Sequence, residues 1–385
     1  MIDQITIRNF KSIADVTVKL SDVTVLVGRS GVGKTNFVEA IRFLRDVLRG
    51  TQDLHQRWPA IRPLPKTSKP TCFELTFSVH GIADAYTYKI ELVDLRGQMQ
   101  LTKEALYLGK RCLFDQNQPL KLGEGGRKIE WSVEPALVEV PQPGPIALGR
   151  LPALSEAVIA YTALTDSIGC YAFPGDVMLS SPNRASPTAG FSDSGANHLS
   201  TLKKIVSDIH DLTARQRINQ NMSAVSPGVS SIELDRLQSP TKGIVGHVFN
   251  DKTLALELSQ ESEGFRRFLA HLLALYQRPP KILMIFEHPE DGIHPGALSL
   301  LAEEFRSAPG DRRGQVILTT HSPGLLDNFE ASNIRVVEKT GFATDIGPLA
   351  EDQIASLREE LLEPGELLTV TPAKIDRDES VVPTP

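Results

Sequence analysis

A nine-residue segment at positions 28–36, GRSGVGKTN, constrains the fold of this chain more than any other. Its spacing of Gly28, four residues, Gly33, Lys34 and Thr35 is that of a P-loop, which has meaning only between a strand and a helix. Both flanks are present: VTVLV before the segment is typical of a buried strand, and the apolar residues after it recur at helical spacing. The segment therefore predicts a strand, an anion-binding loop and a helix in succession.

The residue types of this loop suit a nucleoside triphosphate with Mg²⁺. Glycine lets backbone N–H groups turn inward around an anion, and the N-terminus of the following helix adds partial positive charge. Lys34 would reach the β- and γ-phosphates, and the Thr35 hydroxyl would hold Mg²⁺. A glycine-rich turn before an ordinary helix is the alternative, but it leaves the agreement of strand, loop and helix unexplained. The predicted nucleotide-binding residues of the loop are Gly28, Ser30, Gly31, Gly33, Lys34, Thr35 and Asn36.

Length, charge and cysteine content bound the class of protein. The 385 residues suffice for one elaborate domain or for two. A formal net charge of −6 provides no global basic field for nucleic acid, although a local basic face is compatible with it. Cys72, Cys112 and Cys170 are scattered and form no CxxC pair, which favours a reducing compartment without a zinc site. No segment resembles a signal peptide or a membrane span, so we expect a cytoplasmic protein without membrane association.

Alternating apolar and polar residues predict strands in the first half of the chain. Two such runs, QITIRNF and DVTVKL, precede the strand VTVLV. Four more, CFELTFSV, YTYKIEL, EALYL and KIEWSV, predict an antiparallel β-rich lobe at 70–170. The proline-rich segment 57–70 predicts an exposed loop, and the Ser-, Pro- and Gly-rich segment 171–197 predicts a long one.

The second half of the chain predicts helices alternating with buried strands. The expected helices are LSTLKKIVSDIHDL (199–212), SEGFRRFLAHLLALY (262–276) and one after Pro295; the expected strands are SSIELDRL, GIVGHVF, LALEL, ILMIF, VILTT and IRVVE. Such alternation indicates a mostly parallel sheet with covered faces. Residues 371–385 have little apolar surface to bury, which predicts a disordered tail.

Polar residues follow two of the apolar strands. Glu287 comes directly after ILMIF, where a P-loop protein needs an acidic partner for Mg²⁺. His321 comes directly after VILTT, from which an imidazole can sense a γ-phosphate. Ser262 and Gly264 open a helix whose first N–H groups suit another phosphate. The order along the chain is therefore P-loop, Ser-x-Gly helix, acidic strand end and histidine strand end.

The order of these segments resembles the ABC-type ATPases of the SMC, RecF and OLD group, above all the compact OLD-like ATPases of bacterial antiphage and DNA-repair systems. ITIRNFKSI resembles the usual start of that group, GKTN its P-loop end, SDSGANHL its Gly-x-Asn-Leu segment, SEGFRR its signature, EHPEDGIHP its Walker B and D-loop, and TTHSP its switch histidine. The matching motifs extend from position 5 to position 323 in the expected order. Jointly they are specific, whereas SEGFRR or TTHSP alone would be weak evidence.

The resemblance implies an α/β P-loop NTPase with ABC-type head architecture: a mostly parallel core sheet, an antiparallel β-rich lobe and a short helical arm. It places one composite domain over 1–370, with a P-loop segment at 1–50, the lobe at 70–170, the arm and strands at 198–250, and the signature, Walker B and switch histidine at 255–340. ATP and Mg²⁺ are the implied cofactors, with Thr35 and Glu287 on the metal.

The resemblance also implies a homodimer that closes around ATP. In this group two subunits sandwich two ATP molecules, and each site combines the P-loop of one subunit with the signature helix of the other. Ser262 and Gly264 would then contact the γ-phosphate bound to the opposite subunit, and ATP would hold a two-fold symmetric dimer together.

One position departs from the pattern of the group. Its members carry an acidic pair at the end of the Walker B strand, and the aligned residues here are Glu287 and His288. The metal-side acid is kept, but histidine takes the position of the general base. A neutral imidazole can polarise water, so hydrolysis is compatible with it; the other interpretation is slow hydrolysis and a long-lived ATP-bound switch. The predicted catalytic residues are Glu287, His288 and His321.

Other functions fit the sequence less well. The 228 positions between Lys34 and Ser262 exceed the separation usual in transporter ATPase subunits, and no Asn-Lys-x-Asp motif supports a GTPase. A non-hydrolysing ATP-dependent scaffold stays open because of His288. The region after TTHSP is too short for the nuclease domain that full OLD proteins append, so we expect a separate nuclease or effector protein, with DNA as a further candidate partner.

Several polar residues have simpler structural explanations. The residues His288, Glu290, Asp291 and His294 lie close in sequence, but their spacing matches no common metal signature. Solvent exposure is the simplest expectation for the basic residues Arg8, Lys11, Arg266 and Arg267.

Overall fold

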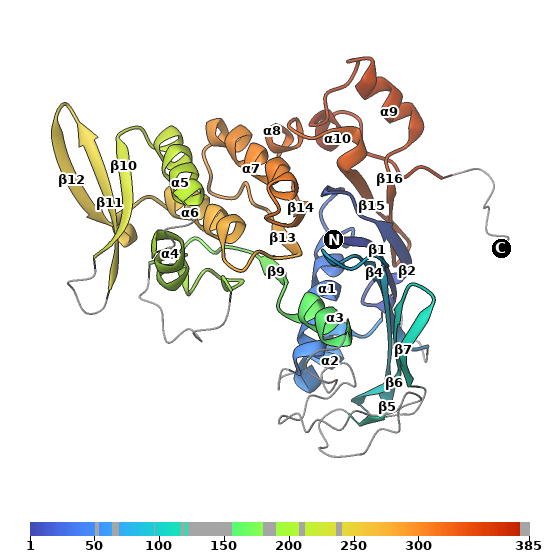
Figure 1. Ribbon diagram of the computed structural model, residues 1–385. Coiled ribbons are helices and arrows are strands. Elements are labelled where there is room, and N and C mark those ends of the chain that lie inside the picture. Colours follow the sequence, from blue (N-terminus) through green and yellow to red (C-terminus); the bar gives the residue numbers. More distant parts are fainter. Residues whose placement is uncertain are drawn as a thin grey trace, which may run out of the picture. The chain divides into compact units, whose positions relative to one another are not determined.

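The computed structural model describes residues 1–50, 54–63, 69–95, 97–116, 120–121, 156–179, 190–207, 212–235 and 241–377 (Figure 1). Contacts within the chain divide it into two compact units. Unit 1 consists of Met1–Ile168, Ile334–Leu362 and Pro372–Pro385, and unit 2 of Gly169–Asn333 and Glu363–Thr371. The segments of the predicted composite domain are distributed over both units, and each unit is described separately below.

Unit 1 contains a seven-stranded antiparallel sheet. Six strands follow the order β2-β1-β4-β5-β6-β7, and β8 pairs with β6. The strands are β1 (Ile2–Phe10), β2 (Ile13–Lys19), β4 (Thr71–Phe77), β5 (Tyr86–Leu95), β6 (Gln98–Leu108), β7 (Arg111–Gln116) and β8 (Leu120–Lys121). Buried residues alternate strictly along β4, as expected where one face of a sheet packs on a core. The predicted antiparallel lobe is confirmed, and the N-terminal hairpin belongs to the same sheet. The expected strand KIEWSV lies outside the described residues.

Three helices lie along one face of this sheet: α1 (Lys34–Arg49), α2 (Leu54–Ile61) and α3 (Glu156–Thr165) (Figure 1). Phe43 of α1 packs against Phe10 and Phe73 of the sheet, with ring centroids 5.7 and 6.3 Å away. The loop predicted for 57–70 is wrong at its start, because α2 continues to Ile61. Trp58 and Ile61 lie three positions apart and are both buried, so a helical turn places both on the core side of α2.

A second set of strands in unit 1 carries the P-loop. β3 (Val23–Val27) is buried along its whole length and pairs in parallel with β15 (Ile334–Thr340). β15 pairs in turn with β16 (Ala343–Pro348) in an antiparallel hairpin, which α9 (Glu351–Arg358) follows. β16 and α9 have no counterpart among the elements expected from the sequence.

The start of the predicted disordered tail is ordered in the structure. Ile375 forms a β-bridge with Leu349, Ala350 N donates to Lys374 O over 2.9 Å, and Arg377 pairs with Glu338 over 3.1 Å. The partner residues lie more than twenty positions before the tail, so the composition of the tail alone could not reveal these contacts. Residues 378–385 lie outside the described residues.

Unit 2 contains the parallel pair β13 (Leu283–Glu287) and β14 (Gln315–Thr319), with β9 (Ile168–Tyr171) next to β13. The helices of this part are α6 (Glu263–Tyr276), α7 (Leu298–Gly310), α8 (Pro323–Leu326) and α10 (Glu366–Thr369), with short 3-10 turns at Leu258–Gln260, Pro295–Ala297 and Ala331–Asn333. Phe286 of β13 packs on Phe305 of α7 and on Tyr171, with ring centroids 4.8 and 5.1 Å away. The parallel pairs β13–β14 and β3–β15 confirm the predicted mixed α/β fold with parallel core pairing.

The rest of unit 2 is an arm with its own three-stranded antiparallel sheet. Its strands are β10 (Val229–Asp235), β11 (Lys242–Phe249) and β12 (Lys252–Glu257), accompanied by α4 (His198–Ser207) and α5 (Leu212–Val225) (Figure 1). The single helix expected over 199–212 is wrong in its extent, because α4 ends at Ser207 and Leu212 begins α5 with 59% of its surface exposed. α5 escaped notice because it is mostly polar and buries only Ala214, Ile218 and Met222. No helix of the described ranges has the length and apolar character to cross a membrane.

Candidate functional site

The P-loop is formed between β3 and α1 of unit 1. β3 ends at Val27 and α1 begins at Lys34, so the strand, loop and helix expected from the sequence are confirmed. The loop is held in a backbone conformation that favours glycine, with φ of +154° at Gly28 and +116° at Gly33. Ser30, Gly31 and Thr35 are exposed at its surface.

Gly28 and Gly33 also have no room for a side chain. A Cβ at Gly28 would lie closer than 3.0 Å to the backbone oxygen of Val337 on β15, and one at Gly33 equally close to the side chain of Thr344 on β16. At Gly31 a Cβ would meet nothing within 4 Å. The β15–β16 hairpin therefore packs against both ends of the P-loop, which fixes the shape of the loop.

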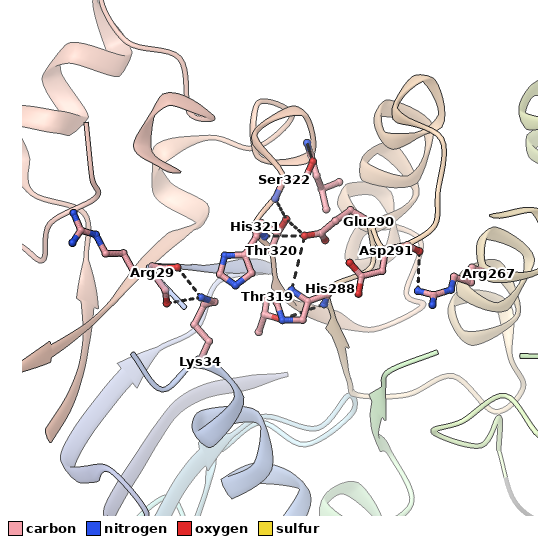
Figure 2. Close-up of polar contacts among 12 residues, drawn as sticks. Arg29, Lys34, Arg267, His288, Glu290, Asp291, Thr319, Thr320, His321 and Ser322 are labelled. Atoms are coloured by element: carbon pink, nitrogen blue, oxygen red, sulfur yellow. Dashed lines mark hydrogen bonds and ion pairs between the residues drawn. The ribbon is translucent and has the colours of Figure 1, made fainter. Parts of the chain in front are cut away.

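Lys34 is 5% exposed and turns its ammonium group onto the loop. Its Nζ donates to Gly28 O over 2.7 Å and to Arg29 O over 3.1 Å, which Figure 2 shows as dashed lines. These two carbonyl groups hold the ammonium group against the backbone of the loop. This placement suits the ammonium of a phosphate-binding loop.

A hydrogen-bond network that sequence reasoning missed connects the P-loop to β16 and to the β1–β2 turn. The buried Thr344 donates its hydroxyl to Val32 O over 2.7 Å, and its Oγ1 lies 2.6 Å from Ser12 Oγ. Thr344 N donates to Ser12 O, and Asn36 Nδ2 donates to Ser12 Oγ, both over 2.7 Å. The Asn36 side chain, predicted to bind nucleotide, therefore ties α1 to the β1–β2 turn. Ser12 lies in the recognised segment ITIRNFKSI, but nothing local marks Thr344.

The basic residues near the start of the chain have carboxylate partners. Arg8 Nε lies 3.1 Å from Asp15, and both side chains are largely exposed. Lys11 forms an ion pair with Glu39 of α1. The exposed pair of Arg8 with Asp15 contributes little to stability. Arg8 and Lys11 are thus each paired with a carboxylate.

The ends of β13 and β14 bring the predicted catalytic residues of unit 2 together. Glu287 stands opposite Thr319 in the parallel register. His288 follows with a φ of +47°, and its N–H donates to Thr319 O over 3.0 Å. The rings of His288 and His321 are stacked, with centroids 5.0 Å apart and planes 8° from parallel (Figure 2). Glu287, His288 and His321 thus lie at one edge of the strand pair.

Glu290 is the residue of this region whose importance the sequence did not reveal. Its Oε1 accepts hydrogen bonds from Thr320 Oγ1 and from His321 N, both over 2.8 Å, and lies 3.9 Å from His288 Nδ1 (Figure 2). Burial alone would raise the pKa of the Glu290 carboxyl, but its contacts with His288, His321 and Thr320 outweigh burial and lower that pKa. Glu290 is therefore a carboxylate at neutral pH.

We call Glu287, His288, Glu290, Thr320 and His321 the strand-end cluster. Glu290 Oε2 is buried and has no hydrogen-bond partner in the part of the chain that the structure describes. A buried carboxylate oxygen without a partner is costly, so it suits an additional polar group. The cluster thus combines a fixed negative charge with two imidazoles at the open end of a strand pair.

The predicted signature begins α6, directly beside the predicted D-loop. Ser262 is exposed and caps the helix, with its Oγ accepting from Phe265 N over 3.3 Å. A Cβ at Gly264 would lie 2.7 Å from Gly292 O, so the absence of a side chain is needed for packing. Arg267 Nη1 donates to Asp291 O over 2.9 Å (Figure 2). The two motifs form one surface of unit 2.

The expectation that Arg266 is solvated is wrong. Arg266 is 6% exposed and donates to Val177 O over 3.0 Å and to Gly175 O over 3.2 Å. Arg266 is not solvated because α6 is buried on nearly all sides. Its hydrogen bonds attach the segment before α4 to the signature helix. His294 accepts a hydrogen bond from Gly296 N over 3.1 Å and caps the following turn.

The Gly-x-Asn-Leu segment forms a closed turn before α4. Asn197 is buried, accepts from Ser192 N over 2.8 Å and donates to Gly190 O over the same distance. Gly195 has a φ of +75°, and a Cβ there would press on Val177. These contacts explain the glycine and the asparagine by local structure.

The residues fit the cofactors that the sequence implies. The glycine positions that admit no Cβ and the buried ammonium of Lys34 suit a triphosphate. The exposed Thr35 and the strand-end residue Glu287 carry oxygen donors of the kind Mg²⁺ prefers. The loop lies in unit 1 and the strand-end cluster in unit 2.

Comparison with known proteins supports this assignment. The family described as "AAA domain, putative AbiEii toxin, Type IV TA system" matches residues 23–327. An SMC head bound to the C-winged helix domain of ScpA aligns with 92% of this chain and 99% of its own at 13% identity, with a TM-score of 0.56. An Smc head with an extended coiled coil, bound to the C-terminal domain of ScpA derived from Pyrococcus furiosus, aligns with 94% and 99% at 13% identity and a TM-score of 0.55. The search among curated proteins gave no match.

The likeness at 13% identity shows the fold. It is that of an SMC head, a P-loop NTPase of ABC type, and the predicted resemblance to the SMC and RecF group is confirmed. The closer resemblance to OLD-like proteins stays a prediction.

Proposed function

This chain belongs to the family of AbiEii-type AAA domains, and on that premise we propose that it binds ATP with Mg²⁺, dimerises around the nucleotide and hydrolyses it. The observation that carries the proposal is the P-loop, in which Lys34 points its ammonium at a loop whose end glycines are fixed by the β15–β16 hairpin. A rigid loop needs little reorganisation on binding, so its N–H groups are preorganised for phosphate.

The residues have distinct roles in this proposal. The N–H groups at the start of α1 bind the phosphates, and Lys34 offsets the charge of the β- and γ-phosphates. Thr35 and Glu287 would hold Mg²⁺, which when bound neutralises charge on the phosphate oxygens. The backbone N–H of His321 donates to Glu290 Oε1, which fixes the chain at this position, and the His321 ring stacks on that of His288.

His288 is proposed as the base that accepts a proton from the attacking water. Its Nδ1 is the ring nitrogen beside the Glu290 carboxylate, and a carboxylate at one ring nitrogen favours a proton there. Nε2 is then the acceptor. The stacked His321 ring further limits rotation of His288.

Steady-state phosphate release from ATP tests this role of His288. The parent should release phosphate, and His288→Ala should lower turnover to the level of Lys34→Ala. His288→Glu should also turn over ATP more slowly than the parent, since a second carboxylate beside Glu290 repels both Glu290 and the γ-phosphate. Faster turnover in His288→Glu would instead show that histidine is a weak substitute for the acidic base of the group. Equal rates in the parent and both variants would remove position 288 from the reaction.

A homodimer with shared sites is proposed because the start of α6 is exposed. Ser262 presents a helix N-terminus of a 14-residue helix at the surface, where it can meet an anion bound to another subunit. Ser262→Arg should therefore abolish dimerisation by a non-hydrolysable ATP analogue while the monomer still binds nucleotide. Light scattering measures this, with Ser230→Arg on β10 as a charge-matched control that still dimerises. Dimerisation of Ser262→Arg, or its loss of nucleotide binding, would contradict the shared site.

The proposed biological role is that of an ATP-driven switch on a separate nuclease or effector protein, or on DNA, in antiphage defence or DNA repair. The sheet of the arm suits a protein partner, because its apolar side chains Phe249 and Leu254 are more than half exposed. Copurification from the native host, followed by identification of the bound protein or nucleic acid, tests this role.

A scaffold that binds ATP without hydrolysing it is the second candidate. His288 at the position of the acidic base favours it. Phosphate release by the parent no faster than by Lys34→Ala, together with ATP-dependent dimerisation, would establish the scaffold.

A further inference from the structure

Phe342 stands at the tip of the β15–β16 hairpin. It is 75% exposed, more than any other large apolar side chain in the described ranges. The strand register pairs Thr340 with Ala343, so Gly341 and Phe342 form a two-residue turn, with a φ of +62° at Gly341. Single exposed apolar residues are common on protein surfaces, so the position of Phe342 in the fold decides its interpretation.

The hairpin that carries Phe342 is attached to the P-loop at both ends of the loop. Val337 O on β15 leaves no room for a side chain at Gly28, and Thr344, two residues after Phe342, does the same at Gly33. Thr344 also donates to Val32 O over 2.7 Å within the loop itself. Phe342 therefore lies two residues along the chain from Thr344, which contacts the P-loop directly.

Polar contacts also stiffen the hairpin along its length. Thr340 Oγ1 donates to Asp345 Oδ2 across the two strands over 3.0 Å. Arg377 lies 3.1 Å from Glu338 and 3.8 Å from Asp345, so it joins β15 to β16 from outside. An aromatic ring on a braced two-residue turn is a platform whose position is set before a ligand arrives.

We propose that Phe342 stacks on the base of the nucleotide whose phosphates bind the P-loop; this inference rests on the proposed function. A phenyl ring has no hydrogen-bonding group, so it recognises a base by its π-face and by burial of apolar surface. The site therefore takes nucleotides in preference to inorganic phosphates, and stacking alone does not distinguish adenine from guanine. Phe342 is a binding residue here and takes no part in the chemistry.

Calorimetric titration of the full chain with Mg·ATP and with Mg·tripolyphosphate tests the inference. In Phe342→Ala the Kd for ATP should rise about tenfold, in the range that loss of one base–aromatic stack produces, while the Kd for tripolyphosphate stays the same. Phe342→Trp should keep the ATP affinity of the parent. Leu361→Ala removes a side chain that is 73% exposed elsewhere in unit 1 and should change neither affinity.

The outcomes separate this inference from the proposed function. An unchanged Kd for ATP in Phe342→Ala would overturn the stacking role while leaving the P-loop assignment intact. An equal loss for ATP and tripolyphosphate would also overturn it, because the hairpin would then act through the shape of the loop. Failure of the parent to bind either ligand would overturn the proposed function and the stacking role with it.

Discussion

The P-loop of unit 1 and the strand-end cluster of unit 2 are built in opposite ways. The P-loop is continuous in sequence, and in the proposed function its backbone N–H groups and missing side chains bind the phosphates. The strand-end cluster comes from two separate segments, 287–290 and 320–321, and its side chains carry the function that we propose for it. A site made of backbone is sensitive to any added Cβ. A site made of side chains can tolerate the exchange of one residue if its neighbours compensate, and this is what we propose for His288.

The largest effect expected from this comparison is that of Gly33→Ala. The new Cβ would overlap the Thr344 side chain, and the φ of +116° at this position strains any residue other than glycine. Strain and overpacking together should lower the unfolding free energy by about 2–4 kcal/mol, and most nucleotide binding should be lost. Gly31→Ala is the control, because its Cβ meets nothing within 4 Å; only the left-handed backbone should cost about 1–2 kcal/mol there. Chemical denaturation and ATP titration measure both. Equal losses in the two variants would show that the hairpin does not fix the loop.

Glu290→Ala should have the next largest effect. It removes the acceptor for Thr320 Oγ1 and His321 N, so about 1.5–3 kcal/mol of unfolding free energy should be lost. Glu290→Gln keeps an acceptor oxygen but no charge, so it should preserve most stability while lowering phosphate release. Denaturation midpoints and steady-state turnover separate the two contributions. Full turnover in Glu290→Gln would show that the charge of Glu290 does not act through His288.

Thr344→Val should have the smallest of these effects. It keeps the shape of the side chain but removes the hydroxyl that bonds Val32 O and Ser12, so about 1–2 kcal/mol of unfolding free energy and a several-fold loss of ATP affinity are expected. Thr253→Val on β12, at an exposed position, should change the unfolding free energy by at most about 0.5 kcal/mol. Identical ATP affinity in Thr344→Val and the parent would separate the network from the function of the loop.

Sequence reasoning found what is encoded locally. The P-loop and its flanks are contiguous, so periodicity and glycine spacing sufficed to predict the strand, loop and helix. Glu287 and His321 could be placed at one edge because each follows an apolar run, and parallel strands end at the same edge of a sheet. The antiparallel lobe followed from strict alternation along β4 and β5.

Contacts between distant segments could not be found in this way. Thr344 supports a loop 312 positions earlier and bonds a serine 332 positions earlier, and no local pattern marks it. Arg266 resembles a solvated helix residue until the burial of α6 and the carbonyls of Gly175 and Val177 are known. Glu290 could not be assigned because its partners come from the end of β14. Long-range packing decides such roles, and tertiary context overrides local propensity.

Calorimetric titration of the parent and of Lys34→Ala with Mg·ATP tests the central claim most directly. The parent should bind ATP at one site per chain. Thermal unfolding and circular dichroism serve to check that the Lys34→Ala variant is folded. The folded variant should bind ATP on the order of 10- to 100-fold more weakly, because a charge-assisted contact to the phosphates is lost. Equal affinity in the folded variant, or no binding by the parent, would contradict the assignment of residues 28–35 as a nucleotide-binding P-loop.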